Sequence, residues 1–290
     1  RTGGEGMILN HDEIDEAEYH RHPALSVSIA KNLLKPGGPA KVNWDMKHGR
    51  AGSRVFDLGH AAHKHALGVG DELVDIGTDL RTKASREAEA KARMAGKVPL
   101  RTADMQVAGA MGAASKAHSL AMELLSDGRP EVSLFGEDGK TGRLIRGRID
   151  WLRDDGILVD YKTTESASAK KFASSAIDFG YHMQAAWYLD LATQLDIPAE
   201  RFVFIAQEKK APYLVNVIEL DADFLHLGRL HNREAIDLWD WCLTNGKWPG
   251  HPDGITTIAP PAWAMRQFDE QLSPDVEAAF ADFLKGFTND

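Results

Sequence analysis

Residues 146–190 have the sequence RGRIDWLRDDGILVDYKTTESASAKKFASSAIDFGYHMQAAWYLD. Its first part alternates or runs apolar at strand length and carries Asp155-Gly156 as a turn signal, which predicts a β-hairpin over residues 143–161. Helical periodicity follows over residues 177–195. The segment therefore predicts two paired strands and a helix that returns to them.

Three charged side chains gather at one edge of this hairpin. Asp150 ends the first strand, and Asp160 and Lys162 close the second, where they share a face because strand side chains alternate. Two carboxylates offer hard oxygen ligands to Mg²⁺. The ammonium can stabilise charge that develops on a phosphorus centre, or help to deprotonate a metal-bound water. The pattern is typical of a phosphodiesterase site.

A lone Asp-x-Lys on a surface strand is usually a solvated ion pair, so the hairpin needs support from elsewhere in the sequence. Gln184 and Tyr188 lie at positions i and i+4 of the following helix and therefore point the same way. A buried Gln and Tyr can also be core polar groups that have found partners. Their coincidence with the Asp-x-Lys pair favours the functional interpretation.

Composition limits the classes of protein that remain. The chain has 290 residues, 43% of them hydrophobic and 27% charged, which is ordinary for a globular protein. Its net charge of −9 argues against a general nucleic-acid coat protein but permits a locally basic channel beside an acidic metal site. The single cysteine, Cys242, excludes a disulfide framework and any four-cysteine cluster. The apolar runs are too short to span a membrane and no signal segment opens the chain, so we expect a cytoplasmic protein.

The pattern of elements predicts one α/β (α+β) domain over residues 7–290, with a central mixed sheet flanked by helices. Residues 1–6 resemble a tag remnant. We expect a mainly helical part over 7–130, the catalytic sheet and helices over 131–250, and a tail over 251–290. Predicted strands cover residues 131–135, 143–152, 156–161, 201–207 and 213–220. Predicted helices run from Ser26 or Ser28 to residue 34 and over 55–66, 102–125, 177–195, 224–244 and 275–286, with an exposed helix or partly mobile arm over 81–97.

The segment 146–190 resembles the RecE-type (exonuclease VIII) branch of the PD-(D/E)XK nucleases, a superfamily that includes the RecB nuclease domain and Cas4. The likeness covers about residues 19–265, and further motifs carry it: YHRHPALSVSIAKNLL, LGHAAHKHAL, FVFIAQEKKAPYLVNVIEL, WPGH and PPAW. One cysteine is too few for the iron–sulfur cluster of Cas4. The sequence also lacks a Gly-x-x-x-x-Gly-Lys-Ser/Thr phosphate loop, so the resemblance implies a nuclease without an ATP motor.

The resemblance implies a role for each residue of the hairpin. Asp150 and Asp160 would be metal ligands, the carbonyl of Tyr161 would complete the metal shell, and Lys162 would be the catalytic lysine. The Gln184–Tyr188 pair matches the Q-x-x-x-Y helix that positions the lysine, the scissile phosphate or both.

A histidine and a further acid complete the site that the resemblance implies. The helical histidine of the family aligns with His63, which would be another metal ligand, while His60 and His65 are near competitors. Glu131 corresponds to the acid that often opens the first core strand, and we expect a supporting role for it.

Basic residues near the hairpin are candidates for phosphate contacts, although solubility is the simpler explanation for any one of them. They are Arg146, Arg148, Lys170, Lys171, Lys209 and Lys210.

The resemblance implies a Mg²⁺-dependent exonuclease, with Mn²⁺ as a possible substitute, that needs no ATP and has no iron–sulfur cluster. It would degrade linear double-stranded DNA 5′→3′ and leave 3′ single-stranded tails for phage or prophage recombination. The resemblance also implies a ring-shaped homo-oligomer and a RecT-like partner that anneals single strands. It implies no association with a membrane. Two alternatives stay open: a related endonuclease or Cas4-like end-processing enzyme, and a non-catalytic DNA-binding protein of the same fold.

Overall fold

The structure is a computed structural model that describes residues 6–49, 54–271 and 278. Contacts divide the chain into two units, Arg1–Gly250 and His251–Asp290. In the second unit the described secondary structure is α11 (Ala262–Gln271), which the sequence did not predict. The helix predicted over residues 275–286 lies outside the described residues apart from residue 278. No helix in the described part of the chain combines the length and apolarity needed to cross a membrane.

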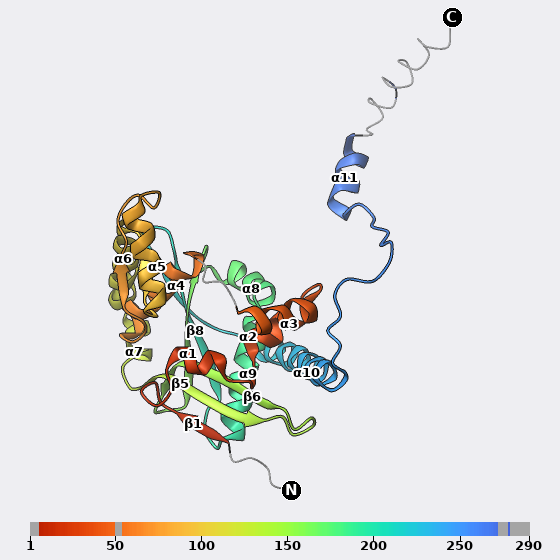
Figure 1. The fold of residues 1–290 in the computed structure, drawn as a ribbon, viewed down its shortest axis with the longest axis horizontal. Helices are drawn as coiled ribbons and strands as arrows, with labels where there is room; N and C mark the ends of the chain where they lie inside the picture. Colours follow the sequence, from red (N-terminus) through yellow and green to blue (C-terminus); the bar gives the residue numbers. More distant parts are fainter. Residues whose placement is uncertain (1–5, 50–53, 272–277, 279–290) are drawn as a thin grey trace, which may run out of the picture. The chain divides into compact units, whose positions relative to one another are not determined.

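A seven-stranded mixed sheet forms the centre of the first unit, which confirms the predicted fold class (Figure 1). The strand order is β1-β5-β6-β7-β8-β9, with β2 beside β6. Of the pairs, β7–β8 and β2–β6 are parallel and the others are antiparallel. The strands are β1 (Met7–Leu9), β2 (Leu25–Ser26), β5 (Gly128–Glu137), β6 (Leu144–Arg153), β7 (Ile157–Thr164), β8 (Arg201–Glu208) and β9 (Val215–Glu219).

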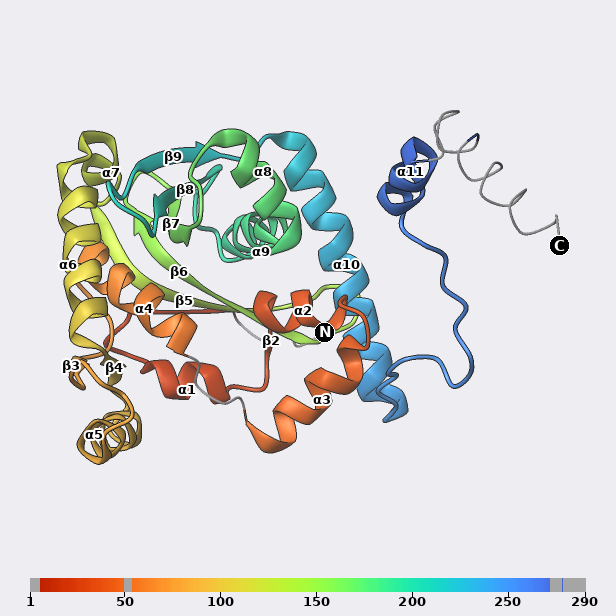
Figure 2. The same ribbon diagram turned by 90° about the horizontal axis from the view of Figure 1, so that it is seen from above.

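Helices cover both faces of this sheet, because its strands alternate apolar side chains toward two separate cores. Leu158 and Phe204 belong to the core under α9, whereas Val159 and Ile205 belong to the core under α4 and α6. Figure 2 shows these helix groups on opposite sides of the sheet. The helices are α1 (Glu16–Arg21), α2 (Val27–Leu33), α3 (Gly38–His48), α4 (Arg54–Leu67), α6 (Thr102–Ala117), α7 (Ser119–Leu124), α8 (Ala169–Asp178), α9 (Tyr181–Gln194) and α10 (Ala222–Asn245).

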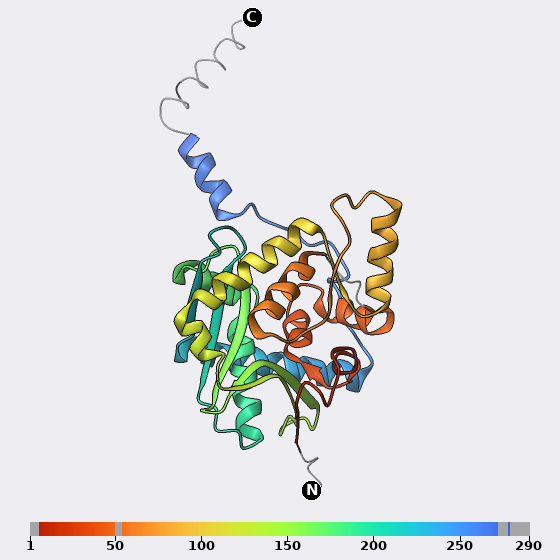
Figure 3. The ribbon, with the colours of Figure 1, turned by 90° about the vertical axis from the view of Figure 1, so that its left-hand side faces the viewer.

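A small parallel sheet, β3 (Leu73–Asp75) with β4 (Val98–Leu100), carries α5 (Lys83–Met94) as its crossover. Figure 3 shows α5 at the periphery. Its Arg93 reaches Asp57 of α4 at 2.7 Å, so the segment that was predicted as a helix or an arm is a helix tied to the main body.

Two predicted helices were wrong in being continuous. The one over residues 102–125 breaks at His118, whose backbone is extended and whose Nδ1 accepts a hydrogen bond from the Ala121 amide, so that it caps α7. The one over 177–195 corresponds to α9 except at its start, where residues 177 and 178 end α8, a helix that the sequence did not predict. The two helices are separated at Gly180, where φ is +67°. A glycine suits this left-handed position because it has no Cβ.

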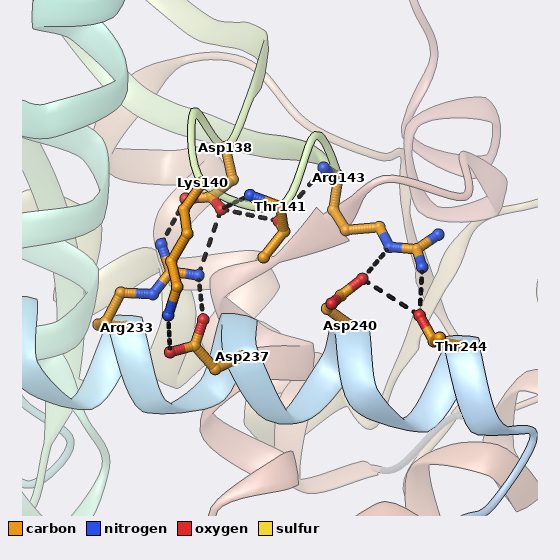
Figure 4. Close-up of polar contacts among 8 residues, drawn as sticks. All are labelled: Asp138, Lys140, Thr141, Arg143, Arg233, Asp237, Asp240 and Thr244. Atoms are coloured by element: carbon orange, nitrogen blue, oxygen red, sulfur yellow. Dashed lines mark hydrogen bonds and ion pairs between the residues drawn. The ribbon is translucent and has the colours of Figure 1, made fainter.

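The turn between β5 and β6 is held onto α10 by a network of charges (Figure 4). Arg233 contacts Asp138 at 2.6 Å and Asp237 at 2.7 Å. Arg143 contacts Asp240 at 2.7 Å, and Lys140 contacts Asp237 at 2.8 Å. The turn between β5 and β6 is therefore anchored to α10, away from the part of β6 that carries Asp150.

Candidate active site

The strands β6 and β7 separate at the acidic edge of the hairpin. Their ladder pairs Trp151 with Val159 and Leu152 with Leu158. Beyond it, Asp150 Oδ2 accepts a hydrogen bond from the Tyr161 amide at 2.9 Å, in place of a backbone acceptor. Because the strands no longer pair, side chains from both faces of the sheet can reach the position between them.

Asp160 is the buried centre of the site. Only 1% of the residue is exposed, and its two oxygens have different partners. Gln184 on α9 donates to Oδ1 at 2.6 Å, and Lys162 places its Nζ 2.5 Å from Oδ2. The predicted Asp160–Lys162–Gln184 group therefore comes together in the fold. Burial and the nearby Asp150 raise the pKa of Asp160 to about 6, despite the contact with Lys162.

His63 approaches the same position from α4, on the opposite face. Its Nε2 lies 3.3 Å from Asp150 Oδ2 and 3.5 Å from Glu131 Oε1. Burial lowers the pKa of His63, but Asp150 and then Glu131 outweigh it and raise the pKa to about 9. His60 instead lies near Glu16, and His65 packs against Gly112 of α6. Of the three histidines, the structure brings His63 to the acids.

Glu131 faces Asp150 across β5 and β6 but leaves the ladder. The neighbouring pairs are Pro130 with Trp151 and Val132 with Ile149, whereas Glu131 has a φ of +51°. A non-glycine residue in this region is strained by about 1–2 kcal/mol. Burial and the Asp150 charge raise the pKa of Glu131 to about 7. Strain and a raised pKa at one residue are typical of a position shaped for function.

The donor atoms suit a divalent cation by their chemistry. Glu131, Asp150 and Asp160 offer hard oxygens and His63 offers an imidazole nitrogen. Burial and then the Asp150 charge raise the pKa of both Glu131 and Asp160, and a cation among the three carboxylates would relieve the repulsion from Asp150. Among the described residues no three acids, histidines or cysteines are arranged as a ready coordination shell. His63 and Lys162 contact the carboxylates directly.

Tyr161 and Tyr188 are placed less directly. The Tyr161 backbone lies between the two aspartates, but its side chain turns to the other face and bonds Gln207. The role of its carbonyl as a ligand stays a prediction. Tyr188 is buried, packs on Phe202 with ring centroids 5.9 Å apart, and bonds the backbone of Arg148. It braces β6, while Gln184 alone of this helix pair contacts Asp160.

The expectation that Arg146 and Arg148 contact phosphate does not fit their packing. Arg146 is 2% exposed, and both guanidinium carbons lie over the ring of Tyr19, at 4.6 and 4.2 Å from its centroid. Arg148 also donates to Ser133 Oγ at 2.9 Å. Both side chains pack beneath the N-terminal segment, which covers the face on which the alternation predicts them. Nε and Nη1 of Arg146 have no hydrogen-bond partner among the described residues.

The four predicted lysines lie where β7 and β8 end and α8 begins. Lys170 and Lys171 follow Lys162 closely in sequence, whereas Lys209 and Lys210 come next to the end of β7 because β8 pairs with it. Lys170 and Lys171 are exposed in the first turn of α8. Lys209 and Lys210 lie 3.5 and 3.7 Å from Glu165. Their contact with DNA stays a prediction.

Lys31 on α2 is a site residue that the sequence did not indicate. Its Nζ donates to Gln184 Oε1 at 3.2 Å, and so fixes the amide that serves Asp160. Burial and the neighbouring Lys162 lower the pKa of Lys31 to about 7. Lys31 lies in the quoted motif YHRHPALSVSIAKNLL, but no role was assigned to it there, and the packing of α2 against α9 brings it to Gln184.

Comparison with known proteins places this geometry in a family. No curated protein matches the sequence. A protein of Eubacterium rectale named "Putative exonuclease" has the same fold, with a TM-score of 0.61 at 16% identity over 90% of this chain and 98% of its own. An alkaline exonuclease (LHK-Exo) from Laribacter hongkongensis matches 67% of this chain and 97% of its own at 12% identity. Its TM-score of 0.28 is too low to indicate a shared fold.

The family model described as a "PDDEXK-like domain of unknown function (DUF3799)" matches residues 26–259. This range contains Asp150, Asp160, Lys162, Gln184 and His63. The resemblance to the PD-(D/E)XK nucleases is thereby confirmed, and the chain belongs to the DUF3799 family of PDDEXK-like domains.

Proposed function

We propose that this chain is a Mg²⁺-dependent, ATP-independent exonuclease that degrades linear double-stranded DNA 5′→3′ and leaves 3′ single-stranded tails. The observation that carries the nuclease part is the meeting of Asp150, the Asp160–Lys162 pair and His63, from three elements, where β6 and β7 separate. The direction, the DNA substrate and Mg²⁺ are supported by the resemblance to RecE-type nucleases.

The residues divide the chemistry among themselves. Asp150, Asp160 and His63 would hold the divalent cation, which supplies Lewis-acid activation of the phosphate and of water. Burial lowers the pKa of Lys162, but Asp160 and Asp150 outweigh it and raise the pKa above its ordinary value. We propose that Lys162 acts as a cation that would stabilise charge on the phosphoryl oxygens. Gln184 keeps Asp160 in position.

Assembly and partners are proposed on the resemblance alone. A ring-shaped homo-oligomer would enclose the DNA, and a RecT-like protein would anneal the exposed strand. Light scattering of the purified full chain measures the oligomer directly, and a monomeric mass would contradict the ring.

The test of the activity is a digestion with Mg²⁺ and without ATP. It compares linear duplex labelled at the 5′ or the 3′ end with closed circular duplex. Asp160→Ala removes a ligand, while Asp155→Ala on the same hairpin is the matched control, since Asp155 is an exposed partner of Arg153.

We expect early release of the 5′ label, an intact circle, loss of cleavage in Asp160→Ala and normal cleavage in Asp155→Ala. Cut circles would favour the endonuclease. An inert protein on every substrate would favour the non-catalytic DNA-binding protein, and full activity of Asp160→Ala would contradict the site itself.

A further inference from the structure

A row of aromatic rings leads from the core to the surface beside Lys162. Phe172 and Phe204 are fully buried and pack against each other with ring centroids 5.4 Å apart. Tyr181 follows, with its centroid 5.5 and 5.7 Å from these two rings. Phe179 ends the row, 5.8 Å from Tyr181, and is 62% exposed. The outermost ring therefore faces solvent on a support that is rigid at its inner end.

Two ammonium groups lie at the middle of this row. The Nζ atoms of Lys162 and Lys31 are each 5.7 Å from the centroid of Tyr181. Lys162 has a carboxylate partner in Asp160. Lys31 contacts the neutral Gln184 amide, and within the described part of the chain no carboxylate lies at ion-pair distance from it. Because burial lowers the pKa of Lys31 to about 7, an anion bound beside it would favour the charged form of the lysine and be held by it.

The cation and the exposed ring are physically joined through Gly180. A Cβ at this residue would lie 3.0–3.2 Å from the Cγ, Cδ and Cε atoms of Lys31. The stem of Lys31 thus crosses the turn between Phe179 and Tyr181. The Lys31 ammonium and the Phe179 ring therefore both lie next to the Tyr181 ring, which the Lys162 ammonium also approaches.

We propose that Lys31 and Phe179 form a nucleotide subsite in which the ammonium binds a phosphate and the ring stacks on the attached base. Exposed aromatic rings beside cations are the way in which proteins hold single nucleotides without reading their sequence. The inference rests on the proposed function and names the part of the substrate next to the cleaved bond. Unlike the predicted surface lysines, this subsite would bind the base as well as the phosphate.

The test measures binding, so that it does not depend on cleavage. Isothermal titration of the full chain in EDTA compares thymidine 5′-monophosphate with 2-deoxyribose 5-phosphate, which has no base. Lys31→Met removes the charge and Lys31→Arg keeps it. Phe179→Leu removes the ring and Phe179→Trp keeps it. Lys47→Met and Trp44→Leu on α3 change an exposed lysine and an exposed aromatic ring elsewhere.

Wild type should bind both ligands, and the mononucleotide more tightly. Lys31→Met should lower the affinity for both ligands about tenfold, whereas Lys31→Arg should bind them as the wild type does. Phe179→Leu should weaken only the mononucleotide, by about tenfold, and Phe179→Trp should retain it. The two α3 variants should bind as wild type. Circular dichroism and thermal unfolding verify that each variant is folded, with Lys31→Gln as a second neutral variant.

The subsite is wrong if wild type does not bind the mononucleotide, if Lys31→Met binds as wild type, or if Phe179→Leu affects both ligands equally. These outcomes are separate from those of the digestion. A protein that cleaves DNA but fails the titration loses the subsite only. One that binds as described but cleaves nothing loses the proposed function and keeps the subsite.

Discussion

Lys162 is paired with a carboxylate that is removed from water. Asp160 is almost fully buried and lies 2.5 Å from the ammonium, so each group stabilises the ionised form of the other. The aspartate would hold the cation and the lysine would face the phosphate. Losing the lysine should therefore impair chemistry more than metal binding.

Lys162→Ala should lower the rate of DNA cleavage by about 100-fold or more, because a preorganised cation is lost from the transition state. Mg²⁺ should still raise the thermal unfolding temperature, since Asp150, Asp160 and His63 remain. Lys83→Ala on α5 is the control, because its side chain is 90% exposed. A rate near that of wild type would remove Lys162 from the mechanism.

Glu131 should reduce the stability of the fold when it is ionised. Its pKa is about 7 in the folded chain against an ordinary value of 4.5, so the folded state disfavours the charged form. The stabilising contribution of the protonated group is complete below about pH 4.5 and is lost as the pH rises through 7. At pH 8, Glu131→Gln should therefore raise the free energy of unfolding by about 1–2 kcal/mol.

Urea unfolding in EDTA at pH 8 and pH 5.5 measures this effect, which should shrink at the lower pH. Glu200→Gln, an exposed carboxylate, should change little at either pH. A Glu131→Gln chain that is less stable than wild type at pH 8 would show that the contact with His63 outweighs the repulsion from Asp150.

The group around Asp160 could be predicted because its residues are close in sequence and follow the alternation of a strand. Asp150, Asp160 and Lys162 lie on one hairpin, and Gln184 comes from the next helix but one. His63 needed the family resemblance, because three histidines on one helix differ only in the direction they face.

Lys31 and the two arginines could not be predicted for a different reason. Alternation shows that Arg146 and Arg148 share a face, but it does not show what covers that face. The cover is Tyr19, which belongs to a segment far away in the sequence. In the same way, Lys31 reaches Gln184 only because α2 packs against α9.

At the scale of elements, the predicted helices were wrong where a helix ends but the spacing of apolar residues continues. Apolar positions continue through His118 and Gly180, so the pattern alone indicates one helix in each case. The helix predicted to end at residue 34 is α2, which ends at Leu33, and the Pro36–Pro39 stretch that follows it also begins α3 at Gly38. Proline near the first turn of a helix is compatible with both functions.

The ion pairs between the β5–β6 turn and α10 should contribute unequally to the stability of the fold. Asp138 is 11% exposed and accepts from Arg233 and from Thr141, whereas Asp240 is 35% exposed. Asp138→Ala should lower the free energy of unfolding by about 1–3 kcal/mol, and Asp240→Ala by less than about 1 kcal/mol. Urea unfolding of the two variants measures both, and equal losses would contradict this ranking.

At the scale of the whole chain, the family model and the first structural unit cover different ranges of residues. The match begins at residue 26, while β1 pairs with β5 and Tyr19 covers two arginines before that point. A fragment of residues 26–259 should therefore be at least about 3 kcal/mol less stable than one of residues 7–259, because it uncovers buried guanidinium groups and a strand edge.

Circular dichroism and urea unfolding of the two fragments test this expectation. Equal stability would show that the N-terminal segment is dispensable.

The sandwich of Tyr19 with Arg146 and Arg148 also bears on how such a protein can change over time. An aromatic ring lost at position 19 would leave two costly charges behind, and two arginines lost together would leave the ring without a surface. The three side chains are thus energetically coupled. A chimera that joins this hairpin to the first residues of a relative should be stable only when those residues supply an aromatic ring to cover the two arginines.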